Sequence, residues 1–422
     1  MSAIRTPRWR RGPVLGVSTS AAVLAVLTLF GGSAASAPRT RLDNATITID
    51  TLPIANGLPL DLGIQKGFFS AQGIDIKKVM FQSGNDIVLA MANKNGDIGY
   101  LGYVPAMIGR TQGIKFQMIS ASEVEGTSVD DNWQNIMVKG SSSIRTPQDL
   151  AGKTIAVNAL KGVGEVMIKA ALKKLGVDPN SPKLLALTFP TMRTALNNGQ
   201  VDAIWTPEPF LTQALTIDGD RIVMAPGPVL GNYFPNGGYG ALGDWVKNNP
   251  DLAKRFRTAI NQSLTYAQTH PDEIRALLPA ATRNVRLPIW SPLIDRKQLL
   301  TLAKYAKEYD VISTLPNFTQ LVPSDIRSGI ATGLLEGSVG PAASISLKQA
   351  GQKAKVLDPG KYLVVVKDNS RALNFHLNGP GVDKKTGVTQ KGTVRWTVSL
   401  APGRYKYGSD TKGGPRGSFR VS

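Results

Sequence analysis

The residues best suited to binding chemistry in this chain of 422 residues lie where predicted helices begin. Ser83-Gly84 precedes an apolar-periodic segment, so Ser83 is a natural N-cap and Gly84 leaves the first amide groups open to a ligand. A second stretch, 158–164, contains two glycines and also leads into a predicted helix. Exposed amides at a helix start favour acidic groups. These two stretches predict a site for a small ligand with an acidic head group.

Trp205 and Glu208 lie at the next predicted junction of a strand and a helix. Trp205 is either a core residue or a surface on which an apolar or ring portion of a ligand packs. Glu208 either accepts a hydrogen bond from an N–H-bearing ligand or caps its own helix. An anionic ligand would be penalised near an ionised Glu208, which favours a ligand with donor groups.

Several kinds of catalytic site are excluded by composition. The chain has no cysteine, which removes disulfides, thiolate metal sites, cysteine nucleophiles and a lipid-modified cysteine. No GxSxG, HExxH or P-loop pattern is present. His270 and His376 are both interpreted as structural. We therefore predict a protein without catalytic activity, metal or cofactor.

The stretch 195–210, ALNNGQVDAIWTPEPF, organises the body of the chain. It predicts a helix end, a turn, a buried strand, and a helix that starts with Thr206 as N-cap and Pro207 at the first position. Residues 91–105 repeat this order, with Gly96-Asp97 before a strand and Tyr103 opening the next helix. Ligands of open α/β sheets bind where such strands end. Two similar α/β lobes facing one cleft are therefore predicted.

The formal net charge of +19 is concentrated at the two ends of the chain. Residues 1–41 carry six Arg and no acidic residue, and residues 351–422 carry nine Lys and five Arg against four Asp. The remaining residues, 42–350, have a net charge of only +3. The central body is therefore not predicted to bind nucleic acid.

Residues 1–37 have the composition of an export signal, with a basic start, an apolar run over 14–30 and small residues up to Ala37. Cleavage after Ala35 is favoured, and an uncleaved membrane anchor is the alternative. We expect an exported protein, located in the periplasm or at the cell envelope.

The alternating pattern assigns residues 42–138 and 223–336 to the first lobe and residues 139–222 to the second. Helices are predicted over 251–268 and 296–310, and a further helical region over 319–335. Residues 337–351 are small and polar, and are predicted to be a linker. Residues 352–422 contain short strand patterns, at 362–366, 372–377, 393–398 and 418–421, and predict an all-β domain.

Residues 45–335 resemble periplasmic substrate-binding proteins of the nitrate/sulfonate/taurine and thiamine-pyrimidine group. The resemblance rests on Gly67-Phe68-Phe69 with Gly73-Ile74, on Gly96-Asp97-Ile98, and on the stretches 149–157 and 195–210. It implies a type II periplasmic-binding fold, in which two lobes joined by two crossing strands clamp a ligand and deliver it to an ABC permease with its ATPase. Some relatives of this fold are enzymes, but those rely on cysteine-containing sites.

The C-terminal domain resembles a cupredoxin-like sandwich through 374–377, 379–382, Trp396 and 417–419. It departs from that family where copper would bind, because Ser409 stands in place of the cysteine ligand and Lys412 in place of a histidine. We therefore expect a metal-free domain. Its net charge of +10 suggests docking on an anionic cell-envelope polymer, and an inert solubilising domain is the alternative.

Within the implied cleft, the side chains expected to orient polar ligand atoms include those of Asn56, Tyr103 and Asn135. The complete set of predicted ligand-binding residues is Asn56, Ser83, Gly84, Tyr103, Asn135, Asn158, Gly162, Pro190, Trp205 and Glu208. The predicted partners are a small solute and an ABC importer, and the chain is expected to be a monomer. An envelope-associated sensor or adhesion protein is the alternative function.

Overall fold

The computed structural model describes residues 44–292, 294–323, 331–340, 344–349, 352–357, 359–389 and 391–422. These residues belong to one compact unit, which spans 42–422. The predicted export signal, 1–37, lies outside the described residues. Within the part that is described, no helix has both the length and the apolar character needed to cross a membrane.

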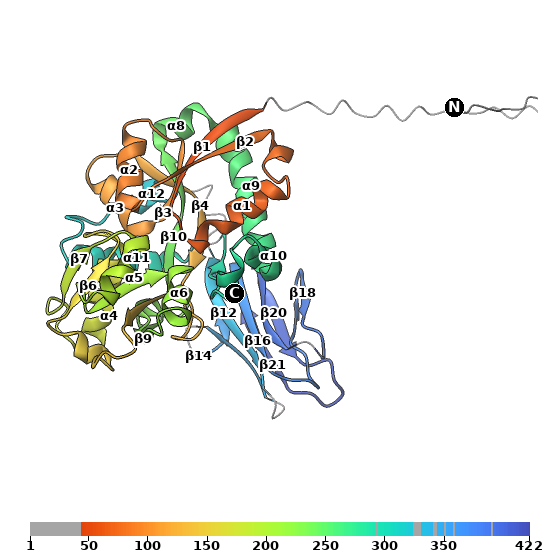
Figure 1. Cartoon of the computed structure of the whole chain (residues 1–422). Helices are drawn as coiled ribbons and strands as arrows, with labels where there is room; N and C mark the ends of the chain where they lie inside the picture. The colour runs from red at the N-terminus through yellow and green to blue at the C-terminus, as the bar shows by residue number, and fades with distance from the viewer. Residues whose placement is uncertain are drawn as a thin grey trace, which may run out of the picture. The chain divides into compact units, whose positions relative to one another are not determined.

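The first lobe is built on a six-stranded mixed sheet with the order β11-β4-β10-β3-β1-β2 (Figure 1). Its strands are β1 Ala45–Thr51, β2 Ile74–Met80, β3 Ile98–Gly102, β4 Phe116–Val124, β10 Pro235–Leu242 and β11 Ile289–Trp290. Strands β2, β1 and β3 are parallel, and β10 is antiparallel to β3 and β4. The helices that connect the parallel strands are α1 Leu58–Gln65, α2 Gly84–Ala92 and α3 Tyr103–Thr111.

The second lobe repeats the same strand order on a five-stranded sheet, β7-β6-β8-β5-β9. Its strands are β5 Gln134–Val138, β6 Thr154–Val157, β7 Lys183–Ala186, β8 Ala203–Pro207 and β9 Arg221–Met224. Its helices are α4 Val163–Lys174, α5 Phe189–Asn197 and α6 Phe210–Thr216. In both lobes, the third parallel strand is followed in the sheet by an antiparallel strand.

An aspartate shortly after a turn glycine, Asp97 after Gly96 and Asp202 after Gly199, has the same structural role in both lobes. Asp97, just before β3, accepts a hydrogen bond from the Thr48 amide of β1 at 2.8 Å, and its own amide donates to the Thr48 carbonyl. Asp202, just before β8, makes the same pair of bonds with Thr154 of β6, again at 2.8 Å for the side chain. Each aspartate therefore fixes the third strand against the first.

Two segments cross between the lobes, residues 125–133 between β4 and β5 and residues 225–234 between β9 and β10. The sequence-based boundaries differ slightly from this arrangement. The sequence predicts that β5 and the end of β9 belong to the first lobe. In the structure, both strands pair within the sheet of the second lobe. The reason is that β5 runs antiparallel between β8 and β9, a pairing that its apolar sequence alone does not specify.

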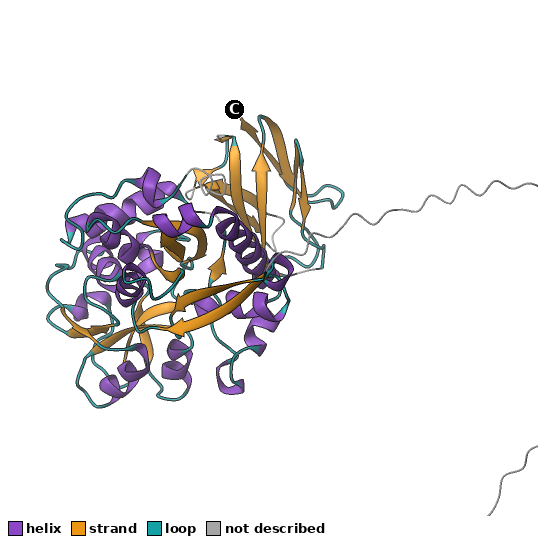
Figure 2. Ribbon diagram, turned by 90° about the horizontal axis from the view of Figure 1, so that it is seen from above, coloured by secondary structure: helices purple, strands orange, loops and turns teal. Residues whose placement is uncertain are grey.

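Helices flank the strands over most of the molecule, and the part that holds the C-terminus is made of strands (Figure 2). Helix α9 packs against α1 and β4, and α11 packs against α3 and α4. The predicted helices at 251–268 and 296–310 are confirmed by α9 and α11. The remaining described helices and their bounds are α7 Pro226–Leu230, α8 Gly243–Asn248, α9 Pro250–Thr269, α10 Pro271–Ala276, α11 Arg296–Glu308 and α12 Phe318–Leu321.

The C-terminal part is a β domain of two five-stranded sheets, ordered β14-β13-β12-β16-β19 and β15-β21-β20-β17-β18. The first sheet contains β12 Ala331–Val339, β13 Ile345–Gln349, β14 Gln352–Lys353, β16 Gly360–Asp368 and β19 Gly392–Leu400. The second contains β15 Val356–Leu357, β17 His376–Gly379, β18 Val382–Lys385, β20 Gly403–Gly408 and β21 Arg416–Val421. Aromatic and aliphatic residues of both sheets, including Phe375 and Tyr405, form its core.

Two predictions at the start of this domain are wrong. Residues 337–351 are not a linker, because they include the end of β12 and all of β13, which pair with each other. Residues 319–335 are not one helix, because helix α12 ends at Leu321 and β12 begins at Ala331. Val339 and Leu347 are both completely buried between the sheets, so a few inward-facing apolar residues outweigh the small polar composition. The strand predicted over 372–377 begins only at His376.

The β domain contacts both segments that cross between the lobes. Lys367 of β16 donates to Thr127 at 3.0 Å and forms an ion pair with Asp131 at 3.8 Å, and both partners belong to the first crossing segment. Asn232 of the second crossing segment donates to Glu336 of β12 at 2.9 Å. Tyr233, Ile289, Leu363 and Val365 form a small apolar cluster at the same junction.

Candidate ligand-binding site

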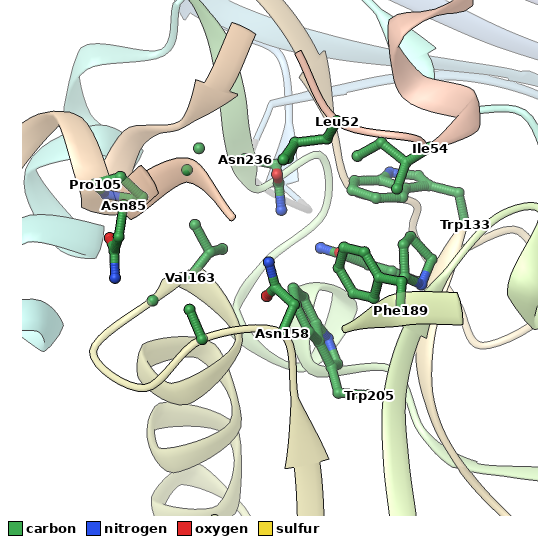
Figure 3. A pocket seen from close by; sticks show the side chains of 16 residues that line it. Leu52, Ile54, Asn85, Pro105, Trp133, Asn158, Val163, Phe189, Trp205 and Asn236 are labelled. Carbon is green, nitrogen blue, oxygen red and sulfur yellow. The ribbon is translucent and has the colours of Figure 1, made fainter. Parts of the chain in front are cut away.

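A cavity of about 50 Å³ lies between the two lobes, where the parallel strands β1, β3, β6 and β8 end. This is the edge at which open α/β sheets hold ligands. Figure 3 shows side chains from both lobes converging on it. Its lining residues are Leu52, Ile54, Gly84, Asn85, Gly102, Pro105, Trp133, Gln134, Asn158, Ala159, Gly162, Val163, Phe189, Trp205, Pro207 and Asn236.

The starts of two helices reach this cavity, one from each lobe. Gly84 and Asn85 are the first residues of α2, and Gly162 and Val163 mark the start of α4. Both helices place the positive end of their dipole at the cavity, which favours negative charge there. Gly162 provides no side-chain cap, so the first amides of α4 stay available to another acceptor.

Four side-chain amides supply the polar groups of the lining. They belong to Asn85, Gln134, Asn158 and Asn236. Figure 3 shows Asn236 and Asn158 projecting toward one another from opposite lobes. None of the described residues that line the cavity carries a charged side chain. Selectivity for charge must therefore come from helix dipoles and from charged groups behind the lining.

Three aromatic rings form the apolar part of the lining. Trp133 is fixed by its indole N–H, which donates to the Val124 carbonyl at 3.1 Å. Phe189 lies against Trp205, with 6.2 Å between the ring centroids. Trp205 is only 3% exposed, and its indole N–H has no hydrogen-bond partner within the described protein. A buried donor without a partner costs free energy, so this group is well suited to a ligand acceptor.

The two lobes touch each other across the cavity mouth. The Asn85 side chain donates to the Leu160 carbonyl at 3.3 Å, and the Asn158 side chain donates to the Gln82 carbonyl at 3.4 Å. Gly102 of the first lobe is so close to Val163 that a Cβ at position 102 would stand 2.3 Å from a methyl group of Val163. The lobes are therefore in a closed arrangement that leaves little free volume.

Four of the ten residues predicted from the sequence line this cavity, namely Gly84, Asn158, Gly162 and Trp205. Ser83 lies directly beside them as the N-cap of α2. Its hydroxyl oxygen accepts from the Asp86 amide at 3.2 Å, and its O–H donates to the Asp86 carboxylate at 2.7 Å. The hydroxyl is therefore already engaged in the N-cap that the sequence predicts for Ser83.

Four other predicted residues do not line the cavity. Asn56 and Tyr103 are buried beneath it in the first lobe, where burial and the nearby Glu123 raise the pKa of Tyr103. The Asn135 side chain donates to the backbone of the first crossing segment. Pro190 is exposed on α5, whereas its neighbour Phe189 lines the cavity. These four were placed by their position in the chain, which does not determine the direction of the side chain.

Glu208 caps its own helix, which was one of the two roles considered for it. Its carboxylate accepts from the Thr212 amide at 3.0 Å, from the Thr212 hydroxyl at 2.9 Å and from the Arg286 amide at 2.9 Å. Burial raises the pKa of this carboxyl, and these hydrogen bonds partly oppose the rise. The prediction that Thr206 caps the helix with Pro207 at its first position is wrong. Both residues belong to β8, and α6 begins only at Phe210.

Several lining residues were missed by reasoning from the sequence, among them Asn85, Trp133, Gln134 and Asn236. Asn85 could have been found, because it directly follows the predicted Ser83-Gly84 helix start. The others lie in the first crossing segment or at the start of the strand that follows a crossing segment, β5 or β10, and no local pattern marks them. The tertiary fold alone brings them to the cavity.

Two carboxyl groups lie buried behind the polar lining. Glu125, the first residue of the first crossing segment, is completely buried, and Glu123 is 4% exposed. Burial raises the pKa of Glu125 to about 8 and that of Glu123 to about 7. The side-chain amides of Gln134 and Asn236 donate hydrogen bonds to Glu125 and oppose the rise there.

Comparison with known proteins gives a consistent result. The family model described as NMT1/THI5 like matches residues 55–274, just over half of the chain. The taurine-binding periplasmic protein of Escherichia coli (strain K12) is 25% identical over 303 residues, which cover 70% of this chain and 84% of that protein. The putative aliphatic sulfonates-binding protein of Bacillus subtilis (strain 168) is 29% identical over 265 residues, covering 61% and 75%.

The structure resembles that of the alkanesulfonate-binding protein SsuA from Xanthomonas axonopodis pv. citri bound to MOPS. The TM-score is 0.55 at 20% identity, and the match covers 67% of this chain and 98% of that one. This likeness shows a mixed α/β periplasmic-binding-protein fold for the two lobes. The β domain adds a strand-rich region to that fold.

Proposed function

Because the chain belongs to the NMT1/THI5 like family, we propose that it is an extracytoplasmic solute-binding protein. It captures a small organic solute between its two lobes and delivers it to an ABC importer, the permease and its ATPase. The relatives at 25% and 29% identity carry names of binding proteins, which supports a role in binding rather than catalysis.

One observation carries this proposal. The cavity lies between two lobes that are joined by two crossing segments, and a helix start from each lobe lines it. A ligand that accepts hydrogen bonds from both helix starts binds the closed form better than the open form. That difference in affinity drives closure.

The proposed solutes carry an acidic head group, with sulfonates and taurine as the leading class. The names of the two relatives support this class, and so do the helix dipoles at a lining without charged side chains. Nitrate, pyrimidines and aromatic acids are the alternatives. The proposed ligand-binding groups are the amides at the starts of α2 and α4, the side chains of Asn85 and Asn158, and the indole of Trp205.

A thermal-shift screen tests the proposed function. A ligand that binds only the native state at one hundred times its Kd stabilises the protein by about 2.7 kcal/mol, which raises the melting temperature measurably. We expect a shift with alkanesulfonates or taurine, and contraction of the protein with the same ligand in small-angle scattering. Turnover of a bound compound by the purified chain would contradict the proposal.

For the β domain we propose a metal-free, cupredoxin-like sandwich that retains the exported protein at the envelope. The support is its net charge of +10 in a chain that has no cysteine for lipid modification. Ser409, at the position expected for a copper-ligating cysteine, bonds within the domain to Asn374 and Thr411. Removing residues 331–422 should release the protein from isolated envelopes at low salt. Unchanged retention would contradict this role.

A further inference from the structure

Glu125 occupies the point where the first lobe passes into the second, and it contacts the cavity lining from behind. It follows β4 directly and is completely buried. Its Oε1 atom accepts from the side-chain amide of Gln134, the first residue of β5, and from that of Asn236 in β10 at 2.8 Å. Gln134 and Asn236 both line the cavity. One carboxyl oxygen therefore holds two ligand-facing amides that come from different lobes.

This contact decides how the two amides are oriented. A carboxylate oxygen only accepts hydrogen bonds, so both Gln134 and Asn236 must turn an N–H toward Glu125. The carbonyl oxygen of each amide is left without this partner, on a side chain that lines the cavity. The helix starts of α2 and α4 supply partial positive charge at the cavity. The lining thus combines helix starts that attract an anion with two amides whose carbonyl oxygens are not used by Glu125.

We propose that Glu125 is a positioning and specificity-determining residue, which gives the cavity its preference for a solute that carries an ammonium group as well as an acidic group. This inference rests on the proposed function. The acidic group lies at the helix starts, and the ammonium group donates to the carbonyl oxygens of Gln134 and Asn236. The negative charge of Glu125 behind these amides stabilises the ammonium group further.

A purely structural role for Glu125 explains its contacts less well. A glutamine has nearly the same size and also offers an oxygen acceptor for the two amides. It would avoid the desolvation penalty of a buried carboxyl group, whose Oε2 atom has no hydrogen-bond partner within the described protein. The carboxyl group therefore adds little to packing, but unlike a glutamine it can ionise when a positively charged group binds nearby.

If Glu125 acts through its charge, binding of an ammonium group should release a proton, whereas a purely structural role predicts no such release. Burial raises the pKa of Glu125 to about 8, so the carboxyl group of the ligand-free protein is mostly protonated at pH 7. An ammonium group bound nearby favours the ionised form, and the proton is then released. The neighbouring carboxylate of Glu123 raises the pKa of Glu125 further. The groups packed around Glu125 are Glu123 of β4, Asn132 of the crossing segment, Gln134 of β5, Asn236 of β10 and Gly227 of α7.

The experiment compares 2-aminoethanesulfonate with ethanesulfonate, which differ only by the amino group. Titration calorimetry at pH 7, in two buffers of different ionisation enthalpy, measures affinity and proton release for the full chain. The variants are Glu125→Gln, which removes the charge and keeps an acceptor, and Glu125→Met, which removes both. Glu123→Gln is the matched control, because it removes a similarly buried carboxyl group that contacts neither amide.

We expect the wild-type protein to bind the amino compound at least about tenfold more tightly, as for a hydrogen bond to a charged group, and to release protons only with that compound. Both Glu125 variants should lose this preference and the proton release, whereas Glu123→Gln should keep the preference for the amino compound. Equal affinities in the wild type, or a preference retained in both Glu125 variants, would overturn the inference and leave the proposed function standing. Failure of both sulfonates to bind would overturn the sulfonate class and the inference together.

Discussion

Replacing Glu125 with glutamine should make the protein less sensitive to alkaline pH. Burial raises the pKa of this carboxyl from 4.5 to about 8, so the folded state holds the proton more tightly than the unfolded state. The sign follows from linkage. The stabilising effect of the bound proton is complete below pH 4.5 and is lost as the pH rises through 8. The loss is about 1.4 kcal/mol per pH unit, or roughly 5 kcal/mol over the whole interval as an upper figure.

Urea unfolding at pH 5, 6, 7 and 8 measures this effect in the wild type and in Glu125→Gln. The free energy of unfolding of the wild type should fall relative to that of the variant by about 1.4 kcal/mol per pH unit. Glu123→Gln separates the two buried carboxyl groups, because the pKa of Glu123 is raised only to about 7 and its effect ends at lower pH. Parallel stability curves for the wild type and Glu125→Gln would refute the reasoning.

Three further predictions concern lobe closure, ligand contact and the β domain. Gly102→Ala places a methyl group 2.3 Å from Val163, so it should hinder closure, weaken solute binding in calorimetry by about tenfold or more, and leave thermal stability nearly unchanged. Trp205→Phe removes a buried N–H without a partner, so it should weaken binding of the acidic solute without lowering the melting temperature; a large loss of stability would instead indicate a core role. Burial lowers the pKa of His376, but hydrogen bonds to Asp410 and Asp383 outweigh that effect and raise it above 6.5, so the stability advantage over His376→Gln should be complete below pH 6.5 and fade at higher pH. A constant advantage from pH 5 to 9 would contradict this assignment.

Local signals in the sequence were sufficient for the repeated α/β units. The glycine turns with a following aspartate before β3 and β8, the N-cap at Ser83 and the Gly162 start of α4 all depend on neighbouring residues, so they could be identified without the fold. The same reasoning located Gly84, Asn158, Gly162 and Trp205 at the cavity. The same reasoning misplaced the helix start at Thr206, because the cap is the side chain of Glu208, which lies between the two prolines.

The first strands of the β domain show where local composition misleads. Residues 337–351 are small and polar, and their composition is that of a linker, yet β12 and β13 are held by pairing with each other and by the distant strand β16. Strand formation depends on partners that are far away in the chain and on burial of a few apolar residues. A window of neighbouring residues carries little of that information.

The sequence by itself determined the alternation of strands and helices, the absence of cysteine chemistry, the uneven charge and the helix starts suited to an acidic group. Only the tertiary structure decided which side chains meet. Gln134 and Asn236 lie about a hundred residues apart in the chain, and Glu125 binds both because the crossing segment and β10 pass the same buried point. Side-chain direction and long-range contact depend on packing between elements, and packing is not encoded within any single stretch of residues.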